Sequence, residues 1–189
     1  MRRLGFSLIE LLLVVLVMGI LASMVLAEFQ PNLQSQLESV AQITISELDY
    51  ARGLAVNYGS KYKVTFDKAQ NRFVVEHSGT NASLNTLPPN PFQSPGSSAT
   101  QRVTDFDDLP QLGARVTIHR VVTVATSWTD VTELEFTSLG STTSSASTSI
   151  WLTAGSGKNQ RFMQVSVDPV TGIASIGTVT SATPSSSGG

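Results

Sequence analysis

Residues 5–30 read GFSLIELLLVVLVMGILASMVLAEFQ, a long apolar stretch that contains a single early carboxylate at Glu10. From Leu11 to Ala27, 17 residues follow one another without a charge. About 20 mainly apolar residues are enough to cross a bilayer as an α-helix. The stretch therefore predicts a single membrane-spanning helix, with the rest of the chain on one side of the membrane.

The charges on the two sides of this stretch predict its orientation. Arg2 and Arg3 precede it, whereas the first charges after it are the acidic residues Glu28 and Glu38. Because positive residues stay on the cytoplasmic side, we expect a cytoplasmic N-terminus and an external C-terminal part.

Three interpretations of the apolar stretch remain open on these observations. It could be a secretory signal peptide that is removed whole, with Val25-Leu26-Ala27 as the cleavage site. It could be a plain membrane anchor. Neither interpretation explains Glu10, since a carboxylate hinders insertion into the bilayer. The third interpretation is one in which the carboxylate has a function.

The run Gly5-Phe6-Ser7-Leu8-Ile9-Glu10-Leu11-Leu12 resembles the cleavage and methylation signal of type IV prepilins and type II secretion pseudopilins. In that family a prepilin peptidase cuts after the glycine, and the new N-terminal residue is N-methylated. The resemblance implies cleavage between Gly5 and Phe6, methylation of Phe6, and an assembly role for Glu10. Many members carry a proline within the apolar helix, whereas the first proline here is Pro31.

The same resemblance implies the location and partners of the protein. We expect a single-pass protein of the bacterial inner membrane, with a periplasmic C-terminal domain that can be extracted into a filament. The implied partners are the prepilin peptidase, other pseudopilins or pilins, the inner-membrane assembly platform and the lipid bilayer.

A second helix is predicted beyond the membrane segment. Apolar residues recur every three or four positions from Leu33 to Tyr58, which is the spacing of an amphipathic helix with one face for a core. Gly59 is a typical C-terminal stop. If the two helical segments were continuous, they would form one long spine.

From residue 61 the apolar period changes to two, which indicates strands. Residues 61–76 predict a hairpin, 78–101 a long loop rich in Pro and Ser, and 141–149 a flexible loop of Ser, Thr and Ala. Roughly seven short strands are expected in all. The predicted fold class is α+β, with a long N-terminal helix packed on an antiparallel sheet. The expected segments are a leader (1–5), a transmembrane helix half (6–30), an amphipathic helix half (31–58), a β-rich domain (59–179) and a disordered tail (180–189).

A looser resemblance, to the H-type minor pseudopilins and the FimT family, covers this second part. It rests on the helix end and on the order of strands and turns: Arg52-Gly53-Leu54-Ala55, Leu134-Glu135-Phe136, Gly140, Ile150-Trp151-Leu152, Val165-Ser166-Val167-Asp168 and Gly172. It implies a minor pseudopilin of a type II secretion system, which is a structural subunit and not an enzyme. The alternative that it leaves open is a FimT-like minor pilin that acts in pilus assembly or DNA uptake.

Candidate chemical sites are few, and no cofactor is expected. The chain has no cysteine. His77 and His119 lie in strand-like segments without ligand partners at suitable spacing, so we interpret them as ordinary strand residues. Asp105, Asp107 and Asp108 form the densest acidic cluster but lack the spacing of a calcium loop. Residues 155–158 are interpreted as a hairpin turn rather than a phosphate loop.

Nucleic-acid binding is disfavoured by the charge distribution. The net charge is -2, and Arg115, Arg120, Lys158 and Arg161 are scattered along the chain rather than clustered. The two tryptophans, Trp128 and Trp151, could stack on a sugar or a base, although Trp151 lies between two apolar residues and is expected to be partly in the core.

Overall fold

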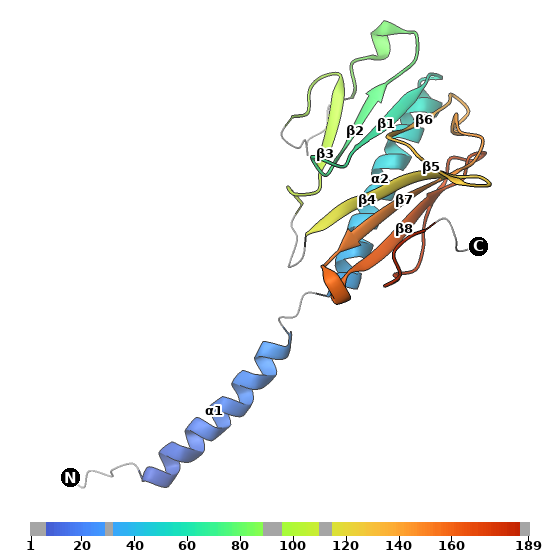
Figure 1. Cartoon of the computed structure of the whole chain (residues 1–189). Coiled ribbons are helices and arrows are strands. Elements are labelled where there is room, and N and C mark those ends of the chain that lie inside the picture. The colour runs from blue at the N-terminus through green and yellow to red at the C-terminus, as the bar shows by residue number, and fades with distance from the viewer. Residues whose placement is uncertain (1–6, 29–31, 89–95, 110–114, 186–189) are drawn as a thin grey trace. The chain divides into compact units, whose positions relative to one another are not determined.

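A computed structural model of the chain describes residues 7–28, 32–88, 96–109 and 115–185, and the side chains of residues 22–28 are outside this description (Figure 1). The leader, with Arg2 and Arg3, and the predicted cleavage site Gly5–Phe6 lie outside the described residues, as does Pro31. The chain divides into two units, Met1–Asn32 and Leu33–Gly189.

The first unit contains helix α1 (Leu8–Glu28), and all its described side chains, from Leu8 to Leu21, are exposed. The apolar residues surround the helix on every side, so that it lacks the polar face of a surface helix. Among the described residues, we find no helix with both the length and the apolar character needed to cross a membrane.

The second unit begins with helix α2 (Leu33–Asn57). Asn32, immediately before it, is not helical, so α1 and α2 are separate elements rather than one unbroken spine. The predicted amphipathic stripe is confirmed, with Leu37, Val40, Leu48 and Leu54 all buried.

Gly59 ends α2 as expected, because it adopts a positive φ of 60°. The backbone N–H of Ser60 donates to the carbonyl of Ala55 (3.1 Å), and that of Gly59 donates to Val56 (3.3 Å). This is the hydrogen-bond pattern of a Schellman cap, in which glycine avoids the cost of a left-handed conformation.

The first of two antiparallel sheets has the strand order β3-β2-β1-β6. Its strands are β1 (Tyr62–Asp67), β2 (Arg72–His77), β3 (Gln101–Asp105) and β6 (Glu133–Phe136). The predicted hairpin is confirmed as β1–β2, with Phe66 opposite Phe73. A short 3₁₀ helix (Ala82–Leu84) interrupts the segment that we expected to be a loop throughout.

The second sheet has the strand order β5-β4-β7-β8-β9. Its strands are β4 (Val116–Val124), β5 (Trp128–Asp130), β7 (Ser147–Ala154), β8 (Arg161–Val167) and β9 (Ala174–Ile176). A 3₁₀ helix (Gly157–Asn159) lies in the β7–β8 connection, which confirms the turn predicted there. The sequence had indicated a single sheet, and strands β3 and β5 were missed.

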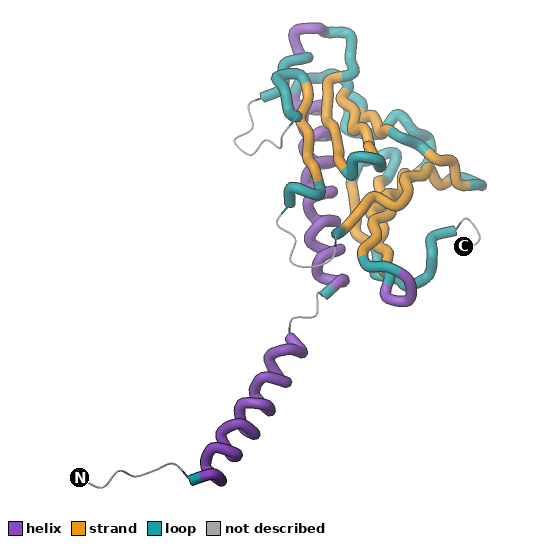
Figure 2. The backbone as a smooth tube through the Cα atoms, turned by 60° about the vertical axis from the view of Figure 1, so that its left-hand side comes forward, coloured by secondary structure: helices purple, strands orange, loops and turns teal. Residues whose placement is uncertain are grey.

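Helix α2 contacts strands of both sheets, and this three-way contact forms the core (Figure 2). Tyr62, Phe136, Ile150 and Val165 are at most 1% exposed, and they belong to one cluster with the buried face of α2. Full burial of such a side chain contributes about 1.5–3 kcal/mol. The α+β class is thus confirmed.

Two expected loop regions are more ordered than their composition indicated. Strand β7 starts at Ser147, inside the predicted flexible loop, and Thr148 and Ser149 are each 1% exposed. Ser149 pairs with β4 and β8, and its hydroxyl accepts a hydrogen bond from Gln164 (2.7 Å). Thr180, which we placed in the tail, forms a bridge with Phe162.

Candidate functional site

Glu10 lies in the first turn of α1, and its side chain is exposed. Its backbone N–H donates to the carbonyl of Ser7 (3.1 Å), so the turn is already helical at this position. A carboxylate near a helix N-terminus is favoured by the helix dipole. None of the described residues forms an ion pair with Glu10.

The acidic residues at and after the end of β3 form hydrogen bonds within the protein. Arg115 donates to Asp107 from Nε to Oδ1 and from Nη2 to Oδ2, and Asn71 Nδ2 donates to the same carboxylate at 3.0 Å. The hydrogen bond from Arg115 is the main cause that lowers the pKa of Asp107. The carboxylate of Asp105 accepts the backbone N–H of Asp107 (2.8 Å). Within the part of the chain that the structure describes, no group of acidic or histidine side chains has the geometry of a metal site.

Asn71 connects this cluster to the second sheet, a role that sequence reasoning missed. It is 2% exposed and has a φ of 51°. Its side-chain amide donates to the carbonyl of Val116 (2.9 Å) and accepts the N–H of Ile118 (3.0 Å). Its only sequence signal was a position in a polar turn, which asparagine favours because it tolerates the left-handed region.

His77 forms two side-chain hydrogen bonds of 2.7 Å, one between Nε2 and Ser60 Oγ and one between Nδ1 and Asn85 Oδ1. Because the amide oxygen of Asn85 can only accept, Nδ1 carries the proton and Nε2 accepts the hydroxyl of Ser60. A hydroxyl, an imidazole and an orienting group in this order can activate a nucleophile. A cavity of about 240 Å³ lies beside His77 and Asn85, lined also by Glu76 and Thr100.

The packing of Gly79 argues against such a reaction at Ser60. A Cβ atom built on Gly79 would lie 2.2 Å from Ser60 Oγ, so this backbone lies directly against the hydroxyl. A carbonyl substrate has no room on that side. We interpret Ser60, His77 and Asn85 as a hydrogen-bonded clamp that fastens the segment after β2 to the end of α2.

His119 packs edge-on against Phe162, with ring centroids 4.9 Å apart. Burial is the main cause that lowers the pKa of His119, and the positive charges of Arg120 and Lys68 add to it. A neutral ring packed on a phenylalanine fits the interpretation of His119 as a strand residue.

The four scattered basic residues do not form a positive patch. Arg115 and Arg120 are each paired with a carboxylate, Asp107 and Asp130 respectively. Arg161 donates to the carbonyls of Lys158 (3.2 Å) and Gln160 (2.8 Å). A phosphate backbone binds through clustered free cations, which this arrangement does not supply.

Comparison with known proteins identifies the N-terminal segment. Residues 1–26 match the model of the prokaryotic N-terminal methylation motif. No curated protein matches the chain.

Three similar solved structures were found. Two are crystal forms of the type IV minor pilin FimU of Pseudomonas aeruginosa, each 18% identical to this chain. The first match covers 75% of this chain and 92% of the FimU chain, with a TM-score of 0.45. The second covers 78% of this chain and 90% of the FimU chain, with a TM-score of 0.46. The third is the minor pseudopilin EpsH from the Type 2 Secretion System of Vibrio cholerae, with 12% identity over 76% of this chain and 97% of that one and a TM-score of 0.47. These values are too low to carry an argument about function. The chain therefore begins with a prokaryotic N-terminal methylation motif, the signal of type IV prepilins and pseudopilins, which is followed by an α+β domain.

Proposed function

We propose that this protein is a minor pseudopilin of a type II secretion system, a structural subunit of an envelope-spanning filament without catalysis. The observation that carries the proposal is the methylation motif at residues 1–26, which runs into an exposed, apolar helix. A separate α+β unit with its own core follows. A helix that is apolar on all sides is not stable in water, and it becomes stable when lipid or other protein chains bury it.

Helix α1 anchors the subunit in the bacterial inner membrane before assembly. Its support is the uncharged run Leu11–Ala27, which comes after the basic residues Arg2 and Arg3. In this orientation the leader is cytoplasmic, and the unit Leu33–Gly189 is periplasmic.

Processing begins with the prepilin peptidase, which cuts between Gly5 and Phe6. The cut removes both leader arginines and creates a positive amine on Phe6, which is then methylated. The new amine is four positions from Glu10 in the sequence, and it pairs with the Glu10 carboxylate of its own chain or of a neighbour in this proposal.

Assembly uses this pair of charges. A carboxylate placed at membrane depth without a partner is unfavourable. When the Phe6 amine of an incoming subunit meets the Glu10 carboxylate of a subunit already in the filament, both charges are neutralised where the dielectric is low. The contact fixes the axial register of the subunits, which the inner-membrane assembly platform then moves outward.

Mass spectrometry of the N-terminal peptide from membranes tests the proposal. We expect a mature chain that starts at methylated Phe6 and keeps α1. A mature chain that starts at Glu28 would show an ordinary signal peptide and would overturn the proposal.

The same motif also fits a minor type IV pilin that acts in pilus assembly or DNA uptake. Deletion of the gene separates the two functions. Loss of protein export with intact pili supports the pseudopilin, whereas loss of pili or of DNA uptake with intact export supports the pilin.

A further inference from the structure

The two tryptophans of the chain stack on each other at the second sheet. Trp128 lies in β5 and Trp151 in β7, the two neighbours of β4, and their ring centroids are 6.1 Å apart with the planes inclined by 26°. Ile150 and Leu152 on either side of Trp151 point into the core. Because side chains alternate along a strand, Trp151 points to the opposite face of the sheet.

The two rings differ in how a ligand can reach them. The indole nitrogen of Trp151 is buried, and it has no hydrogen-bond partner among the described residues. Trp151 is thus the inner ring, whose polar edge is closed to solutes. Trp128 lies on a strand at the edge of the sheet and is partly exposed, so it is the ring that a ligand meets first.

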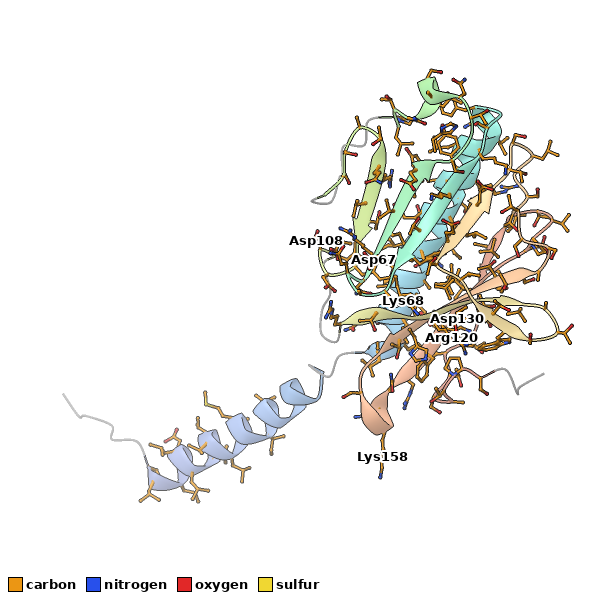
Figure 3. All side chains as sticks on the ribbon, turned by 45° about the horizontal axis from the view of Figure 1, so that its top comes forward. Asp67, Lys68, Asp108, Arg120, Asp130 and Lys158 are labelled. Atoms are coloured by element: carbon orange, nitrogen blue, oxygen red, sulfur yellow. The ribbon has the colours of Figure 1, made fainter. Side chains whose placement is uncertain are left out.

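A polar pair lies beside Trp128. Arg120 donates from Nε to Asp130 Oδ1 (2.7 Å) and from Nη2 to Oδ2 (3.0 Å), and its guanidinium carbon is 5.7 Å from the Trp128 ring centroid. The side chain of Asp130 is 60% exposed. Figure 3 shows Arg120 and Asp130 together, with Lys68 nearby. The bidentate geometry holds donors and acceptors in fixed positions next to the aromatic ring.

This combination fits a neutral polyol with a flat apolar face. The ring of Trp128 matches the C–H face of a sugar ring, while Arg120 donates to and Asp130 accepts from neighbouring hydroxyl groups. A phosphate group fits poorly, because it would have to compete with Asp130 for Arg120 and would meet an exposed carboxylate. In β-1,4-linked chains of glucose or N-acetylglucosamine both linkages are equatorial, so that both faces of each ring remain free for stacking.

We propose that Trp128, Arg120 and Asp130 form a binding site for a linear β-1,4-linked glycan on the outer face of the second sheet. The proposal does not involve Glu10 and does not depend on the filament role proposed above.

The experiment uses the full chain in a zwitterionic detergent without a sugar headgroup. Since both tryptophans belong to this stack, their intrinsic fluorescence reports on the site alone. We expect saturable fluorescence changes with cellohexaose or chitohexaose. Calorimetry then compares the variants, because substitution of a tryptophan alters the optical signal itself.

Trp128→Ala is expected to raise the dissociation constant at least about tenfold, and Trp128→Phe to leave it within about threefold because a ring face remains. Asp130→Asn is expected to weaken binding while leaving the ring in place. Tyr58→Ala is the matched control, since Tyr58 is a 47% exposed aromatic residue at the end of α2, and it should bind like the wild type.

The proposal is overturned if neither glycan binds at concentrations up to about 10 mM, or if binding is the same in Trp128→Ala, Asp130→Asn and the wild type. Binding of oligo-deoxythymidine that depends on salt and on Trp128, without glycan binding, would show a nucleic-acid site instead. Circular dichroism checks that each variant is folded, and Trp128→Phe with Asp130→Asn decides the outcome if Trp128→Ala is not.

Discussion

His119, in β4, is a residue whose protonation makes the stability of the fold depend on pH. Its ring contacts Phe162, and its pKa is lowered by burial first and by Arg120 and Lys68 second. The unfolded chain, in which the histidine pKa is about 6.5, therefore binds the proton more tightly than the folded chain. The stability that His119 contributes is fully present above that value, and it is lost as the pH falls through it towards the folded-state pKa.

We predict that His119→Phe makes the melting temperature less dependent on pH. Phenylalanine keeps an aromatic contact with Phe162 but cannot be protonated. The measurement is near-ultraviolet circular dichroism of the full chain in detergent at about pH 7.5 and about pH 5.5. The carboxylates with lowered pKa values, Glu76 and Glu135, titrate at lower pH and are common to both proteins. An unchanged difference between the two pH values would show that His119 does not carry this dependence.

Asn71 shows how far prediction reaches at the residue scale. The hairpin that contains it was expected from the apolar pattern of residues 61–76 alone. Its hydrogen bonds to Val116 and Ile118, however, connect positions 45 and 47 residues apart. Such contacts depend on how the β1–β2 turn meets β4, which no local pattern encodes.

At the scale of elements, Arg52 of α2 joins two loops that lie far apart in the sequence. Its Nε donates to the carbonyls of Gly140 (3.2 Å) and Thr171 (2.8 Å). Gly172 lies directly against Gly140, since a Cβ at Gly172 would be 2.0 Å from the Gly140 carbonyl oxygen. A side chain at residue 172 would therefore collide with Gly140 and disturb the two loops that Arg52 of α2 joins.

We predict that Gly172→Ala destabilises the protein more than Gly157→Ala. The two glycines have similar φ values, 64° and 57°, but only Gly157 has open space around it. The backbone conformation alone costs alanine about 1–2 kcal/mol. We therefore expect Gly157→Ala to lower the melting temperature by a few degrees and Gly172→Ala by at least about twice as much. Equal decreases in melting temperature for the two variants would mean that the turn between β8 and β9 moves away from Gly140 without loss of stability.

The elements that the sequence predicted well are those that bury a regular apolar pattern. The stripe of α2 and the alternation of β1 were clear, whereas Val74 interrupts the alternation of β2. Strands β3 and β5 were missed, and both lie at an edge of their sheet. In β3 only Val103 is buried, and β5 has three residues, so neither shows the period of a half-buried strand. The division into two sheets follows from long-range pairing, which short-range periodicity does not reveal.

At the scale of the whole molecule, the unit Leu33–Gly189 contains the entire described core. We predict that a chain beginning at Asn32 folds alone as a soluble α+β domain, because both sheets already cover the apolar face of α2. Far-ultraviolet circular dichroism should show one cooperative melting transition with the same midpoint in the presence and absence of EDTA. A large decrease in the midpoint on chelation would indicate that Asp105, Asp107 and Asp108 hold an ion after all.

The candidate assembly site was visible in the sequence for a different reason from the fold. Glu10 is conspicuous because it is the one carboxylate between Phe6 and Ala27, and the motif around it is local. Its partner is expected on another subunit, so the fold of one chain does not contain the contact. The proposed role of Glu10 therefore has to be tested in the assembled system.

We predict that Glu10→Ala is inserted and cut after Gly5 but enters the filament poorly. Removal of a carboxylate does not hinder insertion, since a charged residue at the centre of a spanning helix costs about 2.5–3.5 kcal/mol and less near its end. We expect the substitution to weaken assembly instead, because the Phe6 amine of the neighbouring subunit then stays unpaired at membrane depth. Glu10→Asp should be intermediate, as its shorter side chain weakens the contact, and Glu28→Ala, at the other end of α1, serves as the control. Cross-linking of membrane-extracted chains to other pilin-like subunits, together with a secretion or piliation assay, measures the effect. If Glu10→Ala assembles as well as Glu28→Ala and the wild type, the pairing mechanism is wrong even where cleavage at Gly5 is observed.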